Sequence, residues 1–269
     1  MIIAEALAQA RESIPTGEAR LLLRQVLGCT PADIAAHPER LLTPDESERF
    51  VTLVSRRAAG EPIAYLIGSR EFFGREFQVT PAVLIPRPET EMLVEVALAK
   101  VSRDDTPRIL DLGAGSGCVA ITLALETGTE VTAVDLSTEA LAVARGNAQR
   151  LGATAQFIAS DWFSAIDGAF DLIVANPPYV AEGDPHLTEG DLRFEPALAL
   201  ACGADGLNAI RRIVADTPRH LLPGGWLFME HGYDQAAAVR GLLVEAGFAD
   251  IEQHRDLAGI VRISGGRRA

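Results

Sequence analysis

The stretch RILDLGAGSGCVAITLAL, residues 108–125, joins a short apolar strand to a glycine-rich turn and the start of a helix. Glycines in such a turn let the backbone bend sharply and approach a ligand at the helix N-terminus. Two ligand classes fit. Gly115, Gly117 and Ala120 form the GxGxxA pattern of dinucleotide folds, whereas Asp111 followed by alternating glycines is typical of an S-adenosylmethionine (AdoMet) loop. The motif favours AdoMet over NAD, and a turn without ligand is the third interpretation.

Beyond this stretch, strands and helices alternate along the chain. Apolar strands are expected at residues 108–112, 130–135, 155–159, 170–176 and 225–231, and helices at 137–151, 206–221 and 234–246. Strands separated by helices of this length need right-handed crossovers, and the resulting sheet is mainly parallel and covered on both faces. The sequence therefore predicts a doubly wound, Rossmann-like α/β domain.

The N-terminal part of the chain has a helical pattern instead. Apolar residues recur at helical spacing in residues 2–12, 17–28 and 44–59, and both Thr30-Pro31 and Thr43-Pro44 place a capping residue before a proline, which is typical of a helix start. After these helices come four prolines and the β-prone stretches EFFGREFQV and AVLIP, which favour a hairpin. We expect a small helical bundle over residues 1–60, a linker with a β-hairpin over 61–90, and the α/β domain over 91–269.

Polar side chains follow the second and third strands of the expected sheet. Asp135 ends the segment VTAVD, where a carboxylate can accept hydrogen bonds from both ribose hydroxyls of NAD or AdoMet. Helix capping is the alternative for Asp135. Asp161 and Trp162 follow the next strand and suit an adenine ring, one bonding its exocyclic amine and the other packing on its face. A tryptophan in the core would explain Trp162 as well.

The tetrapeptide Asn176-Pro177-Pro178-Tyr179 ends the fourth strand. Ligands in open α/β sheets bind beyond the carboxyl ends of the strands, so this segment should face the crevice at the glycine loop. The Asn176 side-chain oxygen and the Pro177 carbonyl can each accept a hydrogen bond from a planar nitrogen nucleophile, and Tyr179 can cover the face of the flat group. A structural Pro-Pro turn is the alternative. With the glycine loop, this segment predicts methyl transfer to nitrogen.

Composition and charge limit the kinds of partner. The chain has 24 Lys and Arg against 37 Asp and Glu, a net charge of −13, and the charge is −2 over residues 1–80 but −11 over 81–269. This excess of acid argues against stable binding of nucleic acid through its phosphates. No apolar run approaches the length of a membrane span, and neither a secretory signal nor metal-ligand spacing of the Cys and His residues is present. We expect a cytoplasmic, monomeric protein without a metal or a membrane partner.

Several stretches resemble one family, the HemK/PrmC glutamine N5-methyltransferases that modify class I peptide-chain release factors. The resemblance covers nearly the whole chain, and the PRPETE part of VLIPRPETE (83–91) is more specific to the family than the AdoMet loop is. The other similar stretches are EPIAYLIGSREFFG (61–74), DLGAGSG (111–117), DLSTEALAVARGNAQRLG (135–152), NPPY (176–179), Glu195-Pro196 and LLPGGWLFMEHG (221–232). One departure is Ala114, where family members often have threonine. The resemblance implies a class I AdoMet-dependent methyltransferase domain joined by a hairpin to a helical N-terminal domain that recognises the substrate protein.

The resemblance also implies a reaction and a set of site residues. A methyl group would pass from AdoMet, leaving S-adenosylhomocysteine, to the side-chain amide nitrogen of the glutamine in the release factor's Gly-Gly-Gln motif. Asn176 and Pro177 would be the catalytic residues, and substrate would be bound by Asn176, Pro177, Pro178 and Tyr179. AdoMet would be bound by Asp111, Gly113, Ala114, Gly115, Ser116, Gly117, Asp135, Asp161, Trp162 and Asn176. Arg87, Glu89 and Glu91 could line the same crevice, although an ion-paired hinge explains them equally well.

Other functions remain open at this point. A glutamine of a ribosomal protein, or an exocyclic amine of adenine or guanine in nucleic acid, could be methylated with the same acceptors. From other classes, an NAD-dependent oxidoreductase and a non-catalytic binding module would also use a glycine loop.

Overall fold

The computed structural model describes residues 1–101 and 106–269, which form two compact units. The helical unit consists of Met1–Ser69 together with Thr188–Phe194, and the sheet unit consists of Arg70–Leu187 and Glu195–Ala269. None of the helices in these residues is long and apolar enough to cross a membrane.

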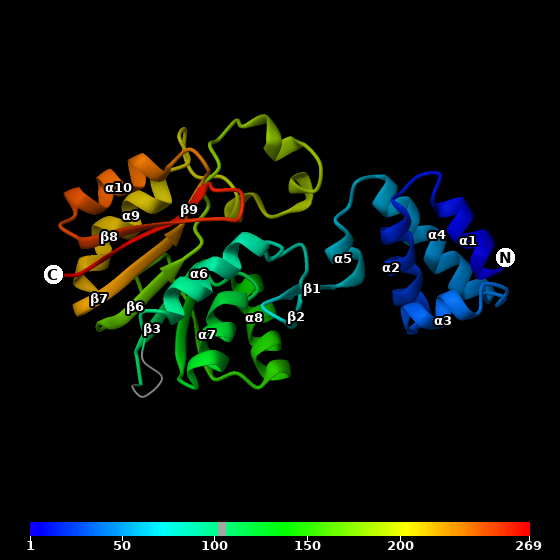
Figure 1. Ribbon diagram of the computed structural model, residues 1–269, viewed down its shortest axis with the longest axis horizontal. Helices are drawn as coiled ribbons and strands as arrows, with labels where there is room; N and C mark the ends of the chain where they lie inside the picture. Colours follow the sequence, from blue (N-terminus) through cyan, green and yellow to red (C-terminus); the bar gives the residue numbers. More distant parts are fainter. Residues whose placement is uncertain (102–105) are drawn as a thin grey trace. The chain divides into compact units, whose positions relative to one another are not determined.

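Short helices pack around one apolar core in the helical unit (Figure 1). They are α1 (Ile3–Ala10), α2 (Thr16–Leu27), α3 (Pro31–Ala36), α4 (Pro44–Ala58) and α5 (Ile63–Ile67). The two helix starts expected at Thr30 and Thr43 are confirmed. Each threonine hydroxyl accepts a backbone N–H three residues later at 3.2 Å, which satisfies a donor that has no partner inside the helix. Segment 188–194 joins this unit through Arg57, which bonds Asp191 at 2.9 Å.

The sheet unit contains a mainly parallel sheet of seven strands within the described residues, in the order β5-β4-β3-β6-β7-β9-β8. The strands are β3 (Ile109–Leu112), β4 (Val131–Asp135), β5 (Ala155–Ala159), β6 (Phe170–Ala175), β7 (Leu221–Glu230), β8 (Ala249–Arg255) and β9 (Val261–Arg267). Among the strand pairings of this sheet in the described residues, only those of β9 with β7 and β8 are antiparallel. A separate hairpin consists of β1 (Ser69–Phe72) and β2 (Arg75–Gln78).

Helices cover both faces of the sheet (Figure 1). Helices α6 (Pro88–Leu98), α7 (Cys118–Thr127) and α8 (Thr138–Leu151) cover one face, and α9 (Asn208–Asp216) and α10 (Ala236–Glu245) cover the other. Successive side chains of a strand point to opposite faces. Leu172 and Val174 of β6 accordingly pack in one core, and Ile173 and Ala175 pack in the other. The expected doubly wound α/β fold is confirmed.

Some local expectations differ from the structure. The strand expected at residues 225–231 begins at Leu221, and the helix expected over 206–221 is α9 followed by a 3₁₀ turn at Thr217–Arg219. The β-prone stretch AVLIP (82–86) forms no strand, because the prolines that flank and end it lack the N–H that a ladder needs. The loop after β6 contains short 3₁₀ turns at Pro185–Thr188, Leu192–Phe194 and Ala197–Ala199.

Candidate active site

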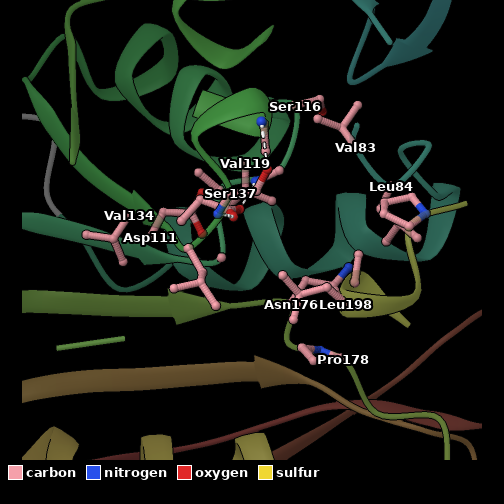
Figure 2. Close-up of a pocket in the computed structure, with 18 of the residues that line it drawn as sticks. Val83, Leu84, Asp111, Ser116, Val119, Val134, Ser137, Asn176, Pro178 and Leu198 are labelled. Atoms are coloured by element: carbon pink, nitrogen blue, oxygen red, sulfur yellow. Dashed lines mark hydrogen bonds between the residues drawn. The ribbon is translucent and has the colours of Figure 1, made fainter. Parts of the chain in front are cut away.

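A pocket of about 310 Å³ opens beyond the carboxyl ends of β3, β4 and β6. Figure 2 shows side chains around it, with Asp111 and Val134 from β3 and β4 and with Asn176 and Pro178 from the end of β6 and the loop after it. Its volume lies at the lower end of the range of small-molecule sites. Its wall is mostly apolar, and three carboxylates lie in it: Asp111, Asp135 and Asp161.

The glycine loop between β3 and α7 forms one side of the pocket. Gly113, Gly115 and Gly117 all have positive φ, at 84°, 54° and 80°, a region that favours glycine. A Cβ on Gly117 would also lie 2.8 Å from Ile121 Cδ1 and 3.1 Å from Ala144 Cβ. The loop therefore needs glycine both for its turn and for the close packing of α7 against α8.

Two side chains of the sheet unit hold this loop in place. Asp135 accepts the backbone N–H of Gly115 at 2.8 Å through Oδ2 and that of Ser137 at 2.9 Å through Oδ1. The amide of Asn147 donates to the Ser116 carbonyl at 2.9 Å. The Ser116 hydroxyl lines the pocket, is buried, and has no hydrogen-bond partner among the described residues. A buried hydroxyl in a pocket wall that also contains carboxylates suits a polar ligand.

Asp111 is buried at the base of the same pocket. Its carboxylate accepts the Ala120 N–H at 3.1 Å. Burial raises the pKa of Asp111 to about 7, because the charged form loses its water, and the negative charge of Asp135 adds to the effect. Burial also raises the pKa of the neighbouring Cys118 thiol to about 12, so this cysteine stays protonated and unreactive.

Asp161 and Trp162 both line the pocket, as expected. The Asp161 carboxylate accepts a hydrogen bond from Arg212 at 2.8 Å, and the Ser160 hydroxyl donates to the Trp162 carbonyl at 2.8 Å. Trp162 has a φ of 53°, which is strained backbone for a bulky residue. Such strain often occurs at ligand sites, and here it accompanies an aromatic ring in the pocket wall.

The segment 176–179 is held at both ends. The Asn176 Nδ2 group donates to the Thr90 hydroxyl at 3.1 Å, while the Tyr179 hydroxyl donates to Glu230 Oε1 at 3.0 Å. Gln235 donates to the Tyr179 carbonyl at 2.9 Å. Burial and the nearby Glu230 carboxylate raise the pKa of Tyr179, and burial raises the pKa of Glu230. The Asn176 and Tyr179 side chains are thus fixed by partners within the protein.

A buried carboxylate fastens another wall of the pocket. Glu195 accepts the Ile85 backbone N–H at 3.0 Å and pairs with the Arg87 guanidinium. Arg87 itself lines the pocket. Glu91 instead accepts the Phe73 N–H at 2.9 Å in the hairpin turn, and Glu89 is not one of the pocket-lining residues.

Most of the residues expected at the site are thus brought together. Among the expected AdoMet-binding residues, only Gly117 is not part of the pocket wall, and among the expected substrate residues, Asn176 and Pro178 line it whereas Pro177 and Tyr179 do not. Sequence reasoning missed Thr90, Glu230 and Gln235. The only signal in the sequence was that Thr90 lies in VLIPRPETE (83–91) and Glu230 in LLPGGWLFMEHG (221–232), two of the stretches that resemble the family.

No group of three or more His, Cys, Asp and Glu residues in the described ranges could hold a metal ion.

The strand order, the glycine loop after β3 and the acidic residue ending β4 together define a class I methyltransferase fold. Comparisons with known proteins agree. Residues 2–68 match the PrmC N-terminal domain, and residues 88–191 match the methyltransferase small domain. A solved 16S rRNA methyltransferase from T. thermophilus, in complex with AdoMet and guanosine, has a similar fold, with a TM-score of 0.56 and 22% identity over 75% of this chain and 50% of that chain.

Sequence relatives narrow the class to one family. The release factor glutamine methyltransferase of Bordetella pertussis is 52% identical over 96% of this chain and 96% of the relative. The protein of the same name from Burkholderia pseudomallei is 52% identical over 93% of this chain and 91% of the relative. The chain therefore belongs to the family of release factor glutamine methyltransferases. This membership decides against an NAD-dependent oxidoreductase and against a non-catalytic binding module.

Proposed function

We propose that this enzyme transfers a methyl group from AdoMet to the side-chain amide nitrogen of the glutamine in the Gly-Gly-Gln motif of class I release factors. The observation that carries the proposal is one pocket lined by both the glycine loop and Asn176. The names of the relatives, release factor glutamine methyltransferase, supply the substrate. S-adenosylhomocysteine would be the second product.

The pocket residues fit AdoMet. Asp135 retains lone pairs for the ribose hydroxyls, and Asp161 and Trp162 would receive the adenine ring. The Ser116 hydroxyl, the loop Gly113–Gly117 and the buried Asp111 carboxylate would face the methionine end. When bound, AdoMet supplies a methyl group on a positively charged sulfur, which makes that methyl an electrophile.

Asn176 and Pro177 would orient the nucleophile. An amide nitrogen reacts poorly because its lone pair is shared with the carbonyl group. Two hydrogen bonds from its N–H groups, one to Asn176 Oδ1 and one to the Pro177 carbonyl, would fix its direction and stabilise the positive charge that develops on it. Pro178 and Tyr179 would complete this substrate site, and the proton on the methylated nitrogen would pass to solvent after methyl transfer. We therefore attribute catalysis to orientation and electrostatics.

Mass spectrometry of a release factor incubated with the enzyme and AdoMet tests this function. We expect one added methyl on the glutamine of Gly-Gly-Gln, and none on a release factor with glutamate at that position. Asn176→Ala should lower the turnover at least about 100-fold while leaving AdoMet affinity within about twofold of wild type. The exposed Asn208→Ala is the matched control. Methyl found only on a ribosomal protein or on nucleic acid would assign the enzyme to one of those substrates instead.

Charge supplies a second, kinetic test of the partner. The net charge of residues 81–269 is −11, and a release factor, which works on ribosomal RNA, should present basic surface. We expect the association rate to fall as salt rises. An unchanged rate would mean that the charge plays no part in recognition. The monomeric state, the cytoplasmic location and the lack of stable nucleic-acid binding stay predictions, and light scattering of the purified enzyme tests the first of them.

A further inference from the structure

Two consecutive hydrogen bonds, one part-buried and one buried, link Asn176 to an acidic residue outside the 176–179 segment. Asn176 Nδ2 bonds Thr90 Oγ1 at 3.1 Å, and Thr90 Oγ1 in turn bonds Glu230 Oε2 at 2.7 Å. Thr90 belongs to the first turn of α6 and Glu230 ends β7; their exposed fractions are 2% and 1%. Thr90 lines the pocket together with Asn176.

The direction of each bond in this chain follows from chemistry. The Thr90 hydroxyl donates its single proton to Glu230 Oε2 at 2.7 Å, and the Tyr179 hydroxyl donates to Oε1 at 3.0 Å, so both oxygens of this carboxyl group act as acceptors. The Thr90 oxygen can then only accept from Asn176, which requires the Nδ2 group and not Oδ1 to face it. The nitrogen and oxygen of an asparagine side chain are nearly equal in size, so shape alone does not fix this orientation. The carboxylate fixes it.

The same carboxylate also holds the far end of the segment. Its other oxygen, Oε1, accepts the Tyr179 hydroxyl at 3.0 Å. Both ends of the segment therefore depend on one buried acidic residue. Burying a carboxylate costs free energy, and here two hydroxyl donors and the positive charge of Arg262 offset the cost, while the negative charge of Glu89 adds to it.

We propose that Thr90 and Glu230 are positioning residues for methyl transfer, which orient the Asn176 carboxamide so that its Oδ1 accepts an N–H from the substrate amide. This inference rests on the proposed function, because it needs a substrate that donates N–H at that point. Thr90 acts through Asn176, whereas Glu230 acts through Thr90 and also holds the Tyr179 hydroxyl. Neither residue is assigned a contact with substrate.

The sharpest test reverses or removes the hydrogen bonds between Asn176, Thr90 and Glu230 with substitutions that keep the shape of the side chains. In Glu230→Gln an amide that can donate replaces the carboxylate, so the Thr90 hydroxyl can turn round and the Asn176 carboxamide can flip. We expect the kcat for the release factor to fall about 10- to 100-fold, with the Kd for AdoMet unchanged within about twofold. Thr90→Val should give a similar or smaller loss, because it leaves the bond between Tyr179 and Glu230 in place. Thr90→Ser, which keeps the hydroxyl, should retain most of the activity.

The kcat losses of the single and double variants distinguish a positioning role from a loss of packing. If both residues act through one hydrogen-bond chain, the double variant Thr90→Val with Glu230→Gln should be no slower than the slower single variant. Thr217→Val is the matched control, because Thr217 is also buried and its hydroxyl bonds a helix carbonyl away from the pocket. It should lower stability without lowering kcat. Full activity of Glu230→Gln, or additive losses in the double variant, would overturn the proposal.

A measurement that needs no substrate keeps this proposal separate from the proposed function. In the wild type, NMR should show the Asn176 side-chain amide protons protected from exchange with water, because one of them donates to Thr90. We expect this protection to fall in both Thr90→Val and Glu230→Gln, and to persist in Thr217→Val. Equal protection in all variants would overturn the positioning role, whereas a wild-type enzyme that fails to methylate release factor would overturn the proposed function alone.

Discussion

Glu195 forms an ion pair with the half-buried Arg87, and the pair fastens residues 82–87 of the pocket wall to the segment that begins at Glu195. The Glu195 side chain is fully buried, and the Ile85 N–H is its other partner. Loss of the arginine leaves a buried carboxylate with one hydrogen bond, which is strongly unfavourable. The pair thus gives the pocket wall a fixed shape.

We expect Arg87→Ala to lower the free energy of unfolding by about 1–3 kcal/mol and to raise the Kd for AdoMet. Urea denaturation and isothermal titration calorimetry measure the two effects. Arg219→Ala is the control, because Arg219 forms an exposed ion pair with Asp216, worth under about 1 kcal/mol. Equal losses in the two variants would show that the Arg87 pair has no special role.

Asp135 should control affinity for AdoMet. Asp135→Asn keeps the shape, but its Nδ2 group can no longer accept a backbone N–H or a ribose hydroxyl. We expect the Kd for AdoMet to rise about 10- to 100-fold. Asp171→Asn is the matched control, since Asp171 also accepts a backbone N–H, that of Arg108 at 2.8 Å, but is not part of the pocket wall. Wild-type affinity in Asp135→Asn would contradict the proposed ribose site.

Two glycines of the sheet unit should respond oppositely to alanine. Gly117→Ala places a Cβ at a φ of 80° and within 3.1 Å of Ala144, so we expect a loss of roughly 1–3 kcal/mol in stability. Gly146 lies exposed inside α8 with nothing within 4 Å of a new Cβ. Gly146→Ala should raise stability by about 0.5–1 kcal/mol. Chemical denaturation of both variants checks the contrast, and a stable Gly117→Ala would contradict the tight packing of the loop.

Asp111 should make stability depend on pH. Its pKa is raised from 3.8 to about 7 by burial, so the folded protein holds this proton more tightly than the unfolded chain does. The stabilisation from Asp111 is therefore present at low pH and is lost as pH rises from about 4 to 7. Asp111→Asn carries no such charge.

Melting temperatures measured between pH 4.5 and 7.5 test this expectation. Relative to wild type, Asp111→Asn should gain stability as pH rises. The exposed Glu245→Gln is the control and should follow wild type. A constant difference between Asp111→Asn and wild type across this range would contradict the raised pKa.

The parallel part of the fold could be predicted because its strands are buried on both faces. Ile109, Leu110 and Leu112 of β3 are all at most 1% exposed, and such strands appear in the sequence as continuous apolar runs. The glycine loop is equally local, since its turn and its residues are adjacent in the chain. These features need no knowledge of distant contacts.

The antiparallel strands β8 and β9 could not be predicted in this way. β8 reads ADIEQHR, which is polar and only partly buried, and β9 contains Gly265 and Gly266, which are typical of a turn. The structure explains the first glycine. A Cβ on Gly265 would lie 2.2 Å from Phe228 Cδ1, so the Phe228 ring occupies the space of a side chain.

The site residues likewise fall into those that local sequence predicts and those that only the tertiary structure brings together. Asp111, Asp135 and Asn176 were predicted because each lies at or next to the end of a recognisable strand. Thr90 and Glu230 are 140 residues apart and meet only because α6 packs near the end of β7. Their chemistry appears only once the tertiary structure is known. The domain boundaries predicted from sequence and the roles of the site residues stay predictions.

Asn147 makes the hairpin sensitive to what happens at the glycine loop. Its amide spans two places: Nδ2 donates to the Ser116 carbonyl at 2.9 Å and to the Gln78 carbonyl at 3.0 Å, and Oδ1 accepts the Gln78 N–H at 2.8 Å. Where ligand binding orders the loop through this amide and so orders strand β2, linkage requires that ordering of β2 strengthen ligand binding by the same coupling free energy. One amide thus connects cofactor affinity to the rigidity of the hairpin.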